Sequence, residues 1–258
     1  MIDQPVTVDI KADHVATVEI RRPPNNFFSL AMLTGVAEAL EELDDDPACR
    51  AVVLCSEGKH FCAGADFSGR GGSEGEGTDR TEDVYAAAVR IFRTATPIVA
   101  AIQGAAIGGG LGLALTADFR VAAPEARFSA NFARLGFHQG FGLSVTLPRL
   151  VGVQAAADLL YTGRRVKGDE AVALGLADRL VPLDEVRSAA HDLAREIAAS
   201  APLAVRSIRA TLRGDLADRV EAATAHELVE QTRLRATEDF AEGTRAMVER
   251  REPVFRGR

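Results

Sequence analysis

Three short apolar runs, separated by helix-like segments, constrain the fold more than any other feature of this sequence. They cover residues 51–55, 97–103 and 118–123. Such runs indicate strands that are buried on both faces, as in parallel sheets covered by helices. Residues 6–10 and 15–20 alternate apolar and polar side chains and predict a hairpin. The amino-terminal half therefore predicts a largely parallel α/β core.

The carboxy-terminal third changes character and is mostly helical from residue 153 onward. Amphipathic stretches at 183–199 and 216–250 suit helices that pack on the core or on other subunits. We expect residues 1–200 to form a core that carries the site, and residues 201–258 to form a helical carboxy-terminal subdomain. The predicted breaks between helices are Gly163, Gly175, Pro182, Pro202 and Gly214.

Composition excludes several classes of protein. The 258 residues include 47% hydrophobic and 26% charged side chains, which is ordinary for a globular protein, and the net charge is −7. An acidic balance without a basic run argues against nucleic-acid binding. No apolar stretch approaches the roughly 20 residues that span a bilayer. The first 20 residues do not resemble a signal peptide, and the three cysteines lack metal-ligand spacing. We expect a cytoplasmic protein with no metal and no membrane span.

Two glycine-containing turns each follow a buried strand. Residues 108–110 are three glycines that open a helix, and residues 60–66 form the second turn. Glycine lets the backbone approach a ligand closely, and amides at a helix start can stabilise developing negative charge. A dinucleotide site would need a G-x-G-x-x-G spacing that is absent, whereas close packing of helix on strand remains an alternative. The pair of turns predicts two amides that converge on one carbonyl oxygen.

The motifs F-C-A-G-A-D at 61–66 and A-I-Q-G-x-x-I-G-G-G at 101–110 resemble the crotonase superfamily, that of enoyl-CoA hydratases and isomerases. The likeness continues at 117–123, 164–166, 171–177 and 249–255, so it covers essentially the whole chain. It implies a crotonase-like spiral of ββα units with a C-terminal helical trimerisation region, and trimers that often pair into hexamers. The implied ligand is an acyl-CoA, and coenzyme A is part of the substrate rather than a separate cofactor.

The resemblance also implies roles for individual residues. The family polarises the thioester carbonyl with two backbone amides, which fall here on Ala65 and Gly109. The carboxy-terminal region of relatives lends basic residues to the CoA phosphates, and the available cations here are Arg245, Arg250 and Arg251. The other expected substrate-binding positions are Ala63, Asp66, Phe67, Gly108, Gly112 and Phe132.

Two positions depart from the pattern of hydratases. Where those enzymes carry their glutamates, this sequence has Gly112 and Phe132. Hydration of a double bond needs a base to activate water and an acid to protonate the α-carbon, and neither residue can do either. We therefore expect very low hydratase activity, and ordinary isomerisation is also in doubt.

Few side chains are available as replacements. His138, in a segment where relatives line the acyl pocket, is the first candidate, since an imidazole can act as a base near neutral pH. The alternative is a loop histidine that hydrogen-bonds to backbone. Asn131 and Ser144 can only orient a water molecule. The weaker candidates are Asp79, Glu82, Asp83 and Tyr85.

Four phenylalanines cluster between residues 128 and 141 in a chain with 12 in total. They are either core residues or the walls of an apolar pocket for a fatty acyl chain.

Three functions remain open at this stage. The first is an enzyme of the enoyl-CoA hydratase/isomerase family in fatty-acid or acyl-CoA metabolism, with a backbone oxyanion hole and a replacement acid or base. The second is a non-catalytic acyl-CoA binding protein, which the missing glutamates favour. The third is a CoA-thioester or carbon–carbon-bond hydrolase of the same fold.

Overall fold

The computed structural model describes residues 5–66 and 78–258. Its larger sheet has six strands in the order β1-β2-β3-β4-β6-β9. The hairpin pair β1–β2 is antiparallel, and every later pair in this sheet is parallel. The predicted α/β core with a mostly parallel sheet is thereby confirmed. The strand bounds are Val6–Ile10, Val15–Ile20, Ala51–Ser56, Ile98–Ile102, Phe119–Ala122 and Arg179–Leu180.

A second, three-stranded sheet lies next to the first and has the order β5-β7-β8. The bounds of its strands are Ala105–Ile107, Arg127–Ser129 and Val166–Lys167. The sequence patterns did not predict these strands, because runs of two or three residues are too short to show a period. β5 matters for the site, since it connects the end of β4 to the helix that opens with the glycines.

Helices account for most of the remaining described residues. Ser29 caps α1 by accepting a hydrogen bond from the Met32 amide, and Thr237 caps α10 in the same way through the Phe240 amide. The bounds of α1 to α10 are Leu30–Asp45, Thr78–Arg93, Gly109–Ala114, Leu143–Val151, Val153–Thr162, Gly168–Ala173, Val186–Ala198, Pro202–Arg213, Leu216–Arg235 and Glu238–Glu249, with short 3-10 turns at Ala133–Leu135 and Leu183–Glu185.

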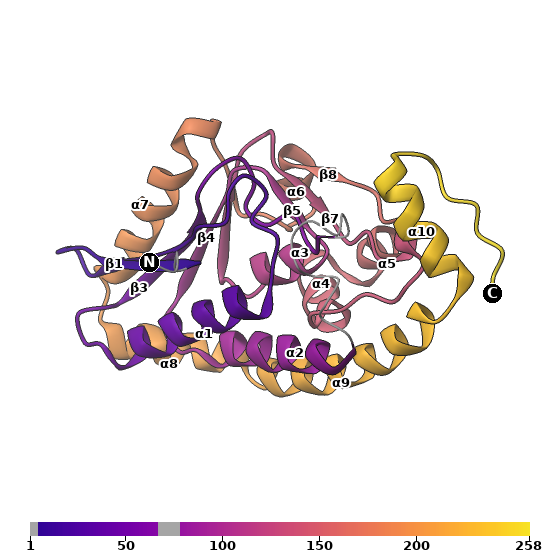
Figure 1. Cartoon of the computed structure of the whole chain (residues 1–258). Coiled ribbons are helices and arrows are strands. Elements are labelled where there is room, and N and C mark those ends of the chain that lie inside the picture. The colour runs from indigo at the N-terminus through magenta and orange to yellow at the C-terminus, as the bar shows by residue number, and fades with distance from the viewer. Residues whose placement is uncertain (1–4, 67–77) are drawn as a thin grey trace.

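The two faces of the larger sheet pack against different helices (Figure 1). Val18 and Leu54 lie in the main hydrophobic core with the apolar sides of α1 and α2. Val53, Val99 and Val121 point to the opposite face, where they pack under α7. Because both faces are covered, the central strands read as continuous apolar runs in the sequence.

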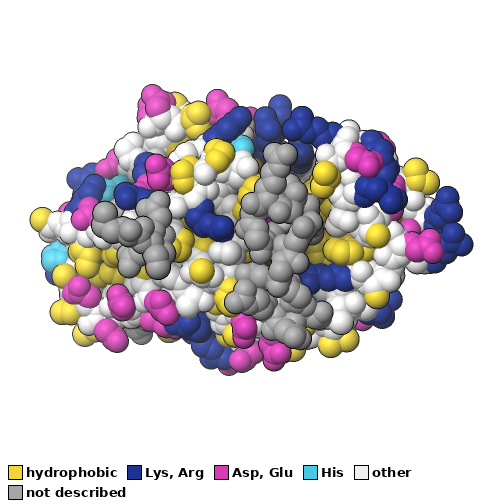
Figure 2. Space-filling model, viewed as in Figure 1, with side chains coloured by type: hydrophobic (Ala, Val, Ile, Leu, Met, Phe, Trp, Pro, Cys, Tyr) yellow, Lys and Arg dark blue, Asp and Glu magenta, His cyan; other side chains and the backbone are white. Residues whose placement is uncertain are grey.

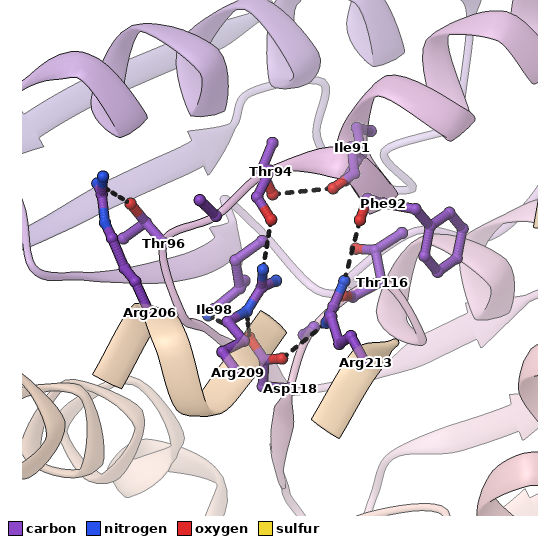
Figure 3. Close-up of polar contacts among 12 residues, drawn as sticks. Ile91, Phe92, Thr94, Thr96, Ile98, Thr116, Asp118, Arg206, Arg209 and Arg213 are labelled. Atoms are coloured by element: carbon purple, nitrogen blue, oxygen red, sulfur yellow. Dashed lines mark hydrogen bonds and ion pairs between the residues drawn. The ribbon is translucent and has the colours of Figure 1, made fainter. Parts of the chain in front are cut away.

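Helix α8 is held to the amino-terminal ends of β4 and β6 by polar contacts (Figure 3). The Asp118 carboxylate accepts hydrogen bonds from the Ile98 amide at 2.8 Å, from Arg209 Nε at 2.8 Å and from Arg213 Nε at 3.0 Å. Arg209 also donates to the Thr94 carbonyl. Two largely buried guanidinium groups therefore share one carboxylate, and we call Asp118, Arg209 and Arg213 the Asp118 cluster.

The opposite side of α8 is apolar and exposed. Leu203, Ile208 and Leu212 are 81%, 59% and 71% exposed, whereas the arginines of the same helix point inward. This arrangement is the reverse of an ordinary surface helix, whose apolar side faces the core.

Helix α9 packs on the rest of the chain. Leu216 and Val220 belong to the same hydrophobic core as α1 and α2, and Val229 farther along the helix is exposed. Helix α10 and the carboxy-terminal tail lie at the opposite end of the molecule from the amino terminus (Figure 1).

The sequence of residues 68–78 is polar and rich in glycine and predicts a surface loop. These residues lie outside the described ranges except for Thr78, the first residue of α2. No helix in the described ranges combines the length and the apolar character needed to cross a bilayer.

Candidate active site

A cavity of about 650 Å³ opens where the chain leaves β3 and β4. The two glycine-containing turns form one wall, and the phenylalanines of the 132–141 segment form another. Residues of α2, α9 and α10 close the far side. Figure 2 shows Lys and Arg side chains gathered along the edge of this face above β8 and around the carboxy-terminal tail.

Backbone pairing brings the two turns together. The Cys62 amide donates to the Ala105 carbonyl at 2.9 Å, and the Ile107 amide donates to the Cys62 carbonyl at 3.0 Å, so residue 62 pairs with β5 as in a parallel ladder. A Cβ at Gly110 would collide with the Cys62 carbonyl. Glycine at this position therefore allows the start of α3 to lie directly against the 60–66 turn.

Two cavity-lining amides have no acceptor within the protein among the residues described. The Gly108 amide donates to the Ser129 carbonyl at 2.8 Å, and the Gly112 amide closes the first helical turn onto the Gly108 carbonyl at 3.1 Å. The amides of Ala65 and Gly109 make no such bond, and both residues line the cavity. Unpaired donors are expected in the first turn of a helix. The structure thus brings together the two residues that sequence reasoning paired.

The ring of Phe28 explains why residue 109 lacks a side chain. A Cβ at Gly109 would lie 2.6 Å from Cε1 of Phe28, which is closer than atoms can approach. Phe28 is itself held by its amide, which donates to the Gly64 carbonyl at 3.1 Å. Any side chain at residue 109 must therefore displace this ring or fill the cavity.

Aromatic side chains fill the space at both positions where hydratases carry glutamates, which are residues 112 and 132 here. Gly112 is buried and does not line the cavity. A Cβ at this residue would lie 2.6 Å from the Cβ and the ring of Phe141. Phe141 has a φ of 63°, which is unusual for a residue other than glycine. Phe132 lines the cavity beside Gly108.

His138 does not reach the cavity. Its Nδ1 lies 2.8 Å from the Gln139 carbonyl oxygen, and its ring packs edge-on against His226 with centroids 5.8 Å apart. Its neighbours Phe137 and Gly140 line the cavity, whereas His138 does not. The position of His138 therefore gives no support to an acid–base role.

Ala63 and Asp66 line the cavity as expected, and Asp66 is buried. Phe67 lies outside the described residues. Within the described part of the lining, Asp66 is the one carboxylate. No group of three His, Cys, Asp or Glu side chains that could hold a metal ion is found in the described ranges.

Four polar residues that the sequence did not indicate as a group lie at the far side of the cavity. They are Thr81, Tyr85, Gln231 and Arg235. Burial, followed by the charge of Glu227, raises the pKa of Tyr85, so its hydroxyl stays protonated at neutral pH. The sequence named Tyr85 as a weak candidate and gave no signal for the others, because α2 and α9 lie about 150 positions apart.

The three arginines expected at the CoA phosphates do not line the cavity. Arg245 and Arg251 both pair with Glu242, and Arg250 ends α10 in a left-handed conformation. The arginines that do line it within the described chain are Arg127, Arg165 and Arg235, of which the first two are exposed.

His60 also lines the cavity. Burial, followed by the charges of Lys59 and Arg127, lowers the pKa of His60, whose Nδ1 accepts a hydrogen bond from the Ala105 amide.

Comparison with known proteins identifies the family. A family profile described as Enoyl-CoA hydratase/isomerase matches residues 11–258. The chain belongs to the enoyl-CoA hydratase/isomerase family. A protein of Thermus thermophilus, provisionally named an enoyl-CoA hydratase, is 36% identical over 253 residues, which cover 96% of this chain and 100% of the relative. A carnitinyl-CoA dehydratase of Salmonella paratyphi A is 31% identical and covers 95% of each chain.

Solved structures of family members share the fold. A carnitinyl-CoA hydratase from Mycobacterium avium superposes with a TM-score of 0.88 at 32% identity and covers 99% of both chains. An enoyl-CoA hydratase/isomerase from Pseudoalteromonas atlantica T6c gives a TM-score of 0.86 at 31% identity and covers 98% of this chain and 100% of that one. The expected crotonase-type architecture is therefore confirmed.

Proposed function

We propose that this protein binds acyl-CoA thioesters in the cavity, with the thioester carbonyl oxygen between the amides of Ala65 and Gly109. The observation that carries the proposal is that these two amides lack acceptors and line the same cavity. An enolate formed from a thioester concentrates negative charge on that oxygen, and a preorganised amide stabilises such charge by about 3 kcal/mol. Family membership and the names of the relatives support the same ligand class.

The proposed chemistry differs from that of an ordinary hydratase. Phe132 and the Gly112–Phe141 contact put hydrocarbon where the resemblance places two carboxylates. Each missing acid or base typically costs about 10²- to 10⁴-fold in rate. We therefore propose an enzyme that uses the two amides for enolate chemistry and hydrates crotonyl-CoA very slowly. The same observation favours a second candidate, a non-catalytic acyl-CoA binding protein.

For the coenzyme, we propose that Ala63 and Asp66 line the pantetheine path and that Arg127 and Arg165 meet the phosphates. Both arginines are exposed members of the cavity lining, and an arginine fork binds phosphate oxygens well. Arg245 and Arg251 are less suited, because Glu242 already engages both guanidinium groups.

We also propose a homotrimer or a hexamer. The support is the exposed apolar side of α8, formed by Leu203, Ile208 and Leu212. Large apolar side chains exposed on a water-facing helix are typical of a contact between subunits. Sedimentation of the full chain as a monomer at micromolar concentration would contradict this assembly.

Calorimetry and a turnover assay test the proposal together. We expect hexanoyl-CoA to bind the purified protein and crotonyl-CoA hydration to be at least about 10²-fold slower than in an ordinary hydratase. The absence of binding for every acyl-CoA tried would overturn the proposed ligand. Hydration at an ordinary rate would overturn the proposed chemistry and leave the ligand in place. Binding without turnover on enolisable thioesters would favour the non-catalytic candidate.

A further inference from the structure

Arg235 is a cation in the cavity that has no carboxylate partner among the residues described. Its guanidinium donates to Thr81 Oγ1 and to Gln231 Oε1, both at 3.1 Å, and it lies over the Phe137 ring at 5.5 Å from the centroid. These partners are two neutral oxygens and an aromatic face. An arginine carries five N–H donors, so donors remain beyond the two that these contacts use.

The Arg235 side chain is half-buried, and this partial burial makes the arrangement costly without a ligand. Removal of the guanidinium from water lowers the pKa of Arg235, which nevertheless stays charged at neutral pH. A buried charge is ordinarily compensated by an opposite charge. The nearby Glu227 does not provide it, because its carboxylate accepts hydrogen bonds from the Gly142 amide and from the amide and hydroxyl of Ser144.

Other buried arginines in the described chain show the ordinary solution. Arg120 pairs with Asp178 at 2.9 Å, and Arg209 and Arg213 pair with Asp118. The half-buried Arg22, Arg50 and Arg206 meet neutral oxygens as Arg235 does, but they do not line the cavity. Arg235 does line it, so a ligand in the cavity can supply its anion.

A line of aromatic rings connects Arg235 to the two unpaired amides. Phe132 lies beside Gly108 and packs against Phe137 with ring centroids 5.3 Å apart, and Arg235 lies on Phe137. An acyl chain that starts at the amides and follows these rings would therefore end near the guanidinium.

Two further donors lie at the same end of the cavity. The tips of Tyr85 and Gln231 both approach Gly140 so closely that a Cβ there would lie 2.6 Å from Gln231 Nε2 and closer still to the Tyr85 hydroxyl. Gln231 is fixed by a hydrogen bond to the His138 carbonyl at 2.9 Å and is only 2% exposed. This end of the cavity is thus rich in donors and suits an anionic group.

We propose that Arg235, assisted by the Tyr85 hydroxyl, binds a carboxylate at the distal end of the acyl group, so that the preferred ligands are CoA thioesters of dicarboxylic acids. This inference rests on the proposed function, since the acyl group must first be held at the amides. It names Arg235 as the residue that determines specificity.

The test compares matched pairs of thioesters by calorimetry. Glutaryl-CoA, adipoyl-CoA and pimeloyl-CoA are each paired with pentanoyl-CoA, hexanoyl-CoA or heptanoyl-CoA, which end in methyl instead of carboxylate. We expect the best-fitting carboxylate to bind at least about tenfold more tightly than its methyl partner, as charge-assisted hydrogen bonds allow. We expect 6-aminohexanoyl-CoA, whose distal group is a cation, to bind more weakly than hexanoyl-CoA.

Variants assign the preference to a residue. Arg235→Gln should abolish the preference for carboxylate, Arg235→Lys should retain part of it, and Tyr85→Phe should reduce it a few-fold. Arg233→Gln is the matched control, because Arg233 is an exposed arginine of the same helix that pairs with Glu230. Circular dichroism on each variant verifies the fold. The comparison of thioester affinities on the wild-type protein tests the preference even if a variant fails to fold.

Two results would overturn the inference while leaving the proposed function intact. One is equal or tighter binding of the methyl-terminated member in every pair. The other is a preference for carboxylate that survives Arg235→Gln in a folded protein. Failure of every thioester to bind would instead contradict the proposed function and remove the basis of the inference with it.

Discussion

Arginines withdrawn wholly or partly from water lie beyond both ends of the larger sheet, but their charges are neutralised differently. At the amino-terminal ends of β4 and β6, Arg209 and Arg213 share the Asp118 carboxylate (Figure 3). In the cavity beyond the carboxyl ends, Arg235 meets neutral oxygens and an aromatic ring. Burial lowers the pKa of Arg213 to about 10 while the Asp118 charge opposes the shift, so the pair stays charged at neutral pH.

The presence or absence of a carboxylate partner distinguishes an arginine with a structural role from one available to a ligand. A compensated charge holds α8 in place and needs no further partner. An uncompensated charge and two uncompensated amides in one cavity are costly in the free protein and favourable once a ligand supplies the acceptors. The amino-terminal end therefore contributes stability, and we propose that the cavity contributes binding.

The largest expected effect is at the Asp118 cluster. Asp118→Ala leaves two largely buried guanidinium groups without their carboxylate, which typically costs about 3–5 kcal/mol of the free energy of unfolding. Urea denaturation measures this loss. The control is Asp218→Ala, which removes an exposed partner of Arg93 and should cost about 1 kcal/mol or less. Equal losses in the two variants would mean that the cluster does not hold α8.

The next effect is expected at the amides. In Gly109→Val, the new side chain meets the Phe28 ring and fills the space beside the amide, so acyl-CoA affinity should fall by at least about 10²-fold. Gly35→Ala is the control, because a Cβ at Gly35 would lie 3.3 Å from Val6, far from the cavity. Calorimetry on both variants gives the comparison, and undiminished binding by Gly109→Val would show that the carbonyl lies elsewhere.

A smaller effect is expected beneath the cavity wall at Gly112. Gly112→Ala places a Cβ 2.6 Å from Phe141, and such overpacking typically costs about 1–3 kcal/mol of stability. Thermal unfolding measures it. For the same reason, a glutamate should fit at residue 112 only when Phe141 is also replaced by glycine, which its φ of 63° would suit. An unchanged midpoint in Gly112→Ala would mean that the ring moves aside freely.

Arg235→Gln should change the free energy of unfolding by about 1 kcal/mol or less, because the loss of two hydrogen bonds and of the contact with the Phe137 ring is offset by removal of an uncompensated charge. Arg213→Gln, which removes an ion pair and contacts to two carbonyl groups, should cost at least about 2 kcal/mol. Denaturation curves of the two variants decide between a binding and a structural role. A cost for Arg235→Gln as large as that for Arg213→Gln would show that Arg235 has a structural role, as Arg213 does.

The smallest effect is expected at Glu242 of α10, which pairs with Arg245 and Arg251. Hydrogen bonds from Arg251, from Arg245 and from the Val254 amide hold the pKa of Glu242 well below its usual range. A lowered pKa means that the contribution to stability is present above the usual glutamate range and is lost as the pH falls through the lowered value. The solvent exposure of the two arginine partners keeps this contribution small. Proteolysis of the carboxy-terminal tail should therefore accelerate only in strong acid, and Glu242→Gln should remove this pH dependence.

Sequence patterns predicted the parts of the fold that rest on local periodicity. The hairpin was found because its apolar and polar residues alternate, and the buried strands were found because each is a short continuous apolar run. The pair Ala65 and Gly109 was found because motifs report backbone geometry. Arg235 and Gln231 were not found, since their role depends on where α9 packs. His138 was favoured for its chemistry and for its place in a segment where relatives line the acyl pocket, but its ring packs against His226.

The central claim is that the amides of Ala65 and Gly109 hold a thioester carbonyl, and carbon-13 NMR of a bound ligand tests it most directly. An acyl-CoA labelled at the thioester carbonyl carbon is added to the wild-type protein and to Gly109→Val. Two hydrogen bonds to the oxygen draw electron density from the carbonyl carbon, so we predict a downfield shift of its resonance on binding to the wild type and no such shift with the variant. A ligand that binds the wild type with its carbonyl resonance unchanged from that in water would contradict the account.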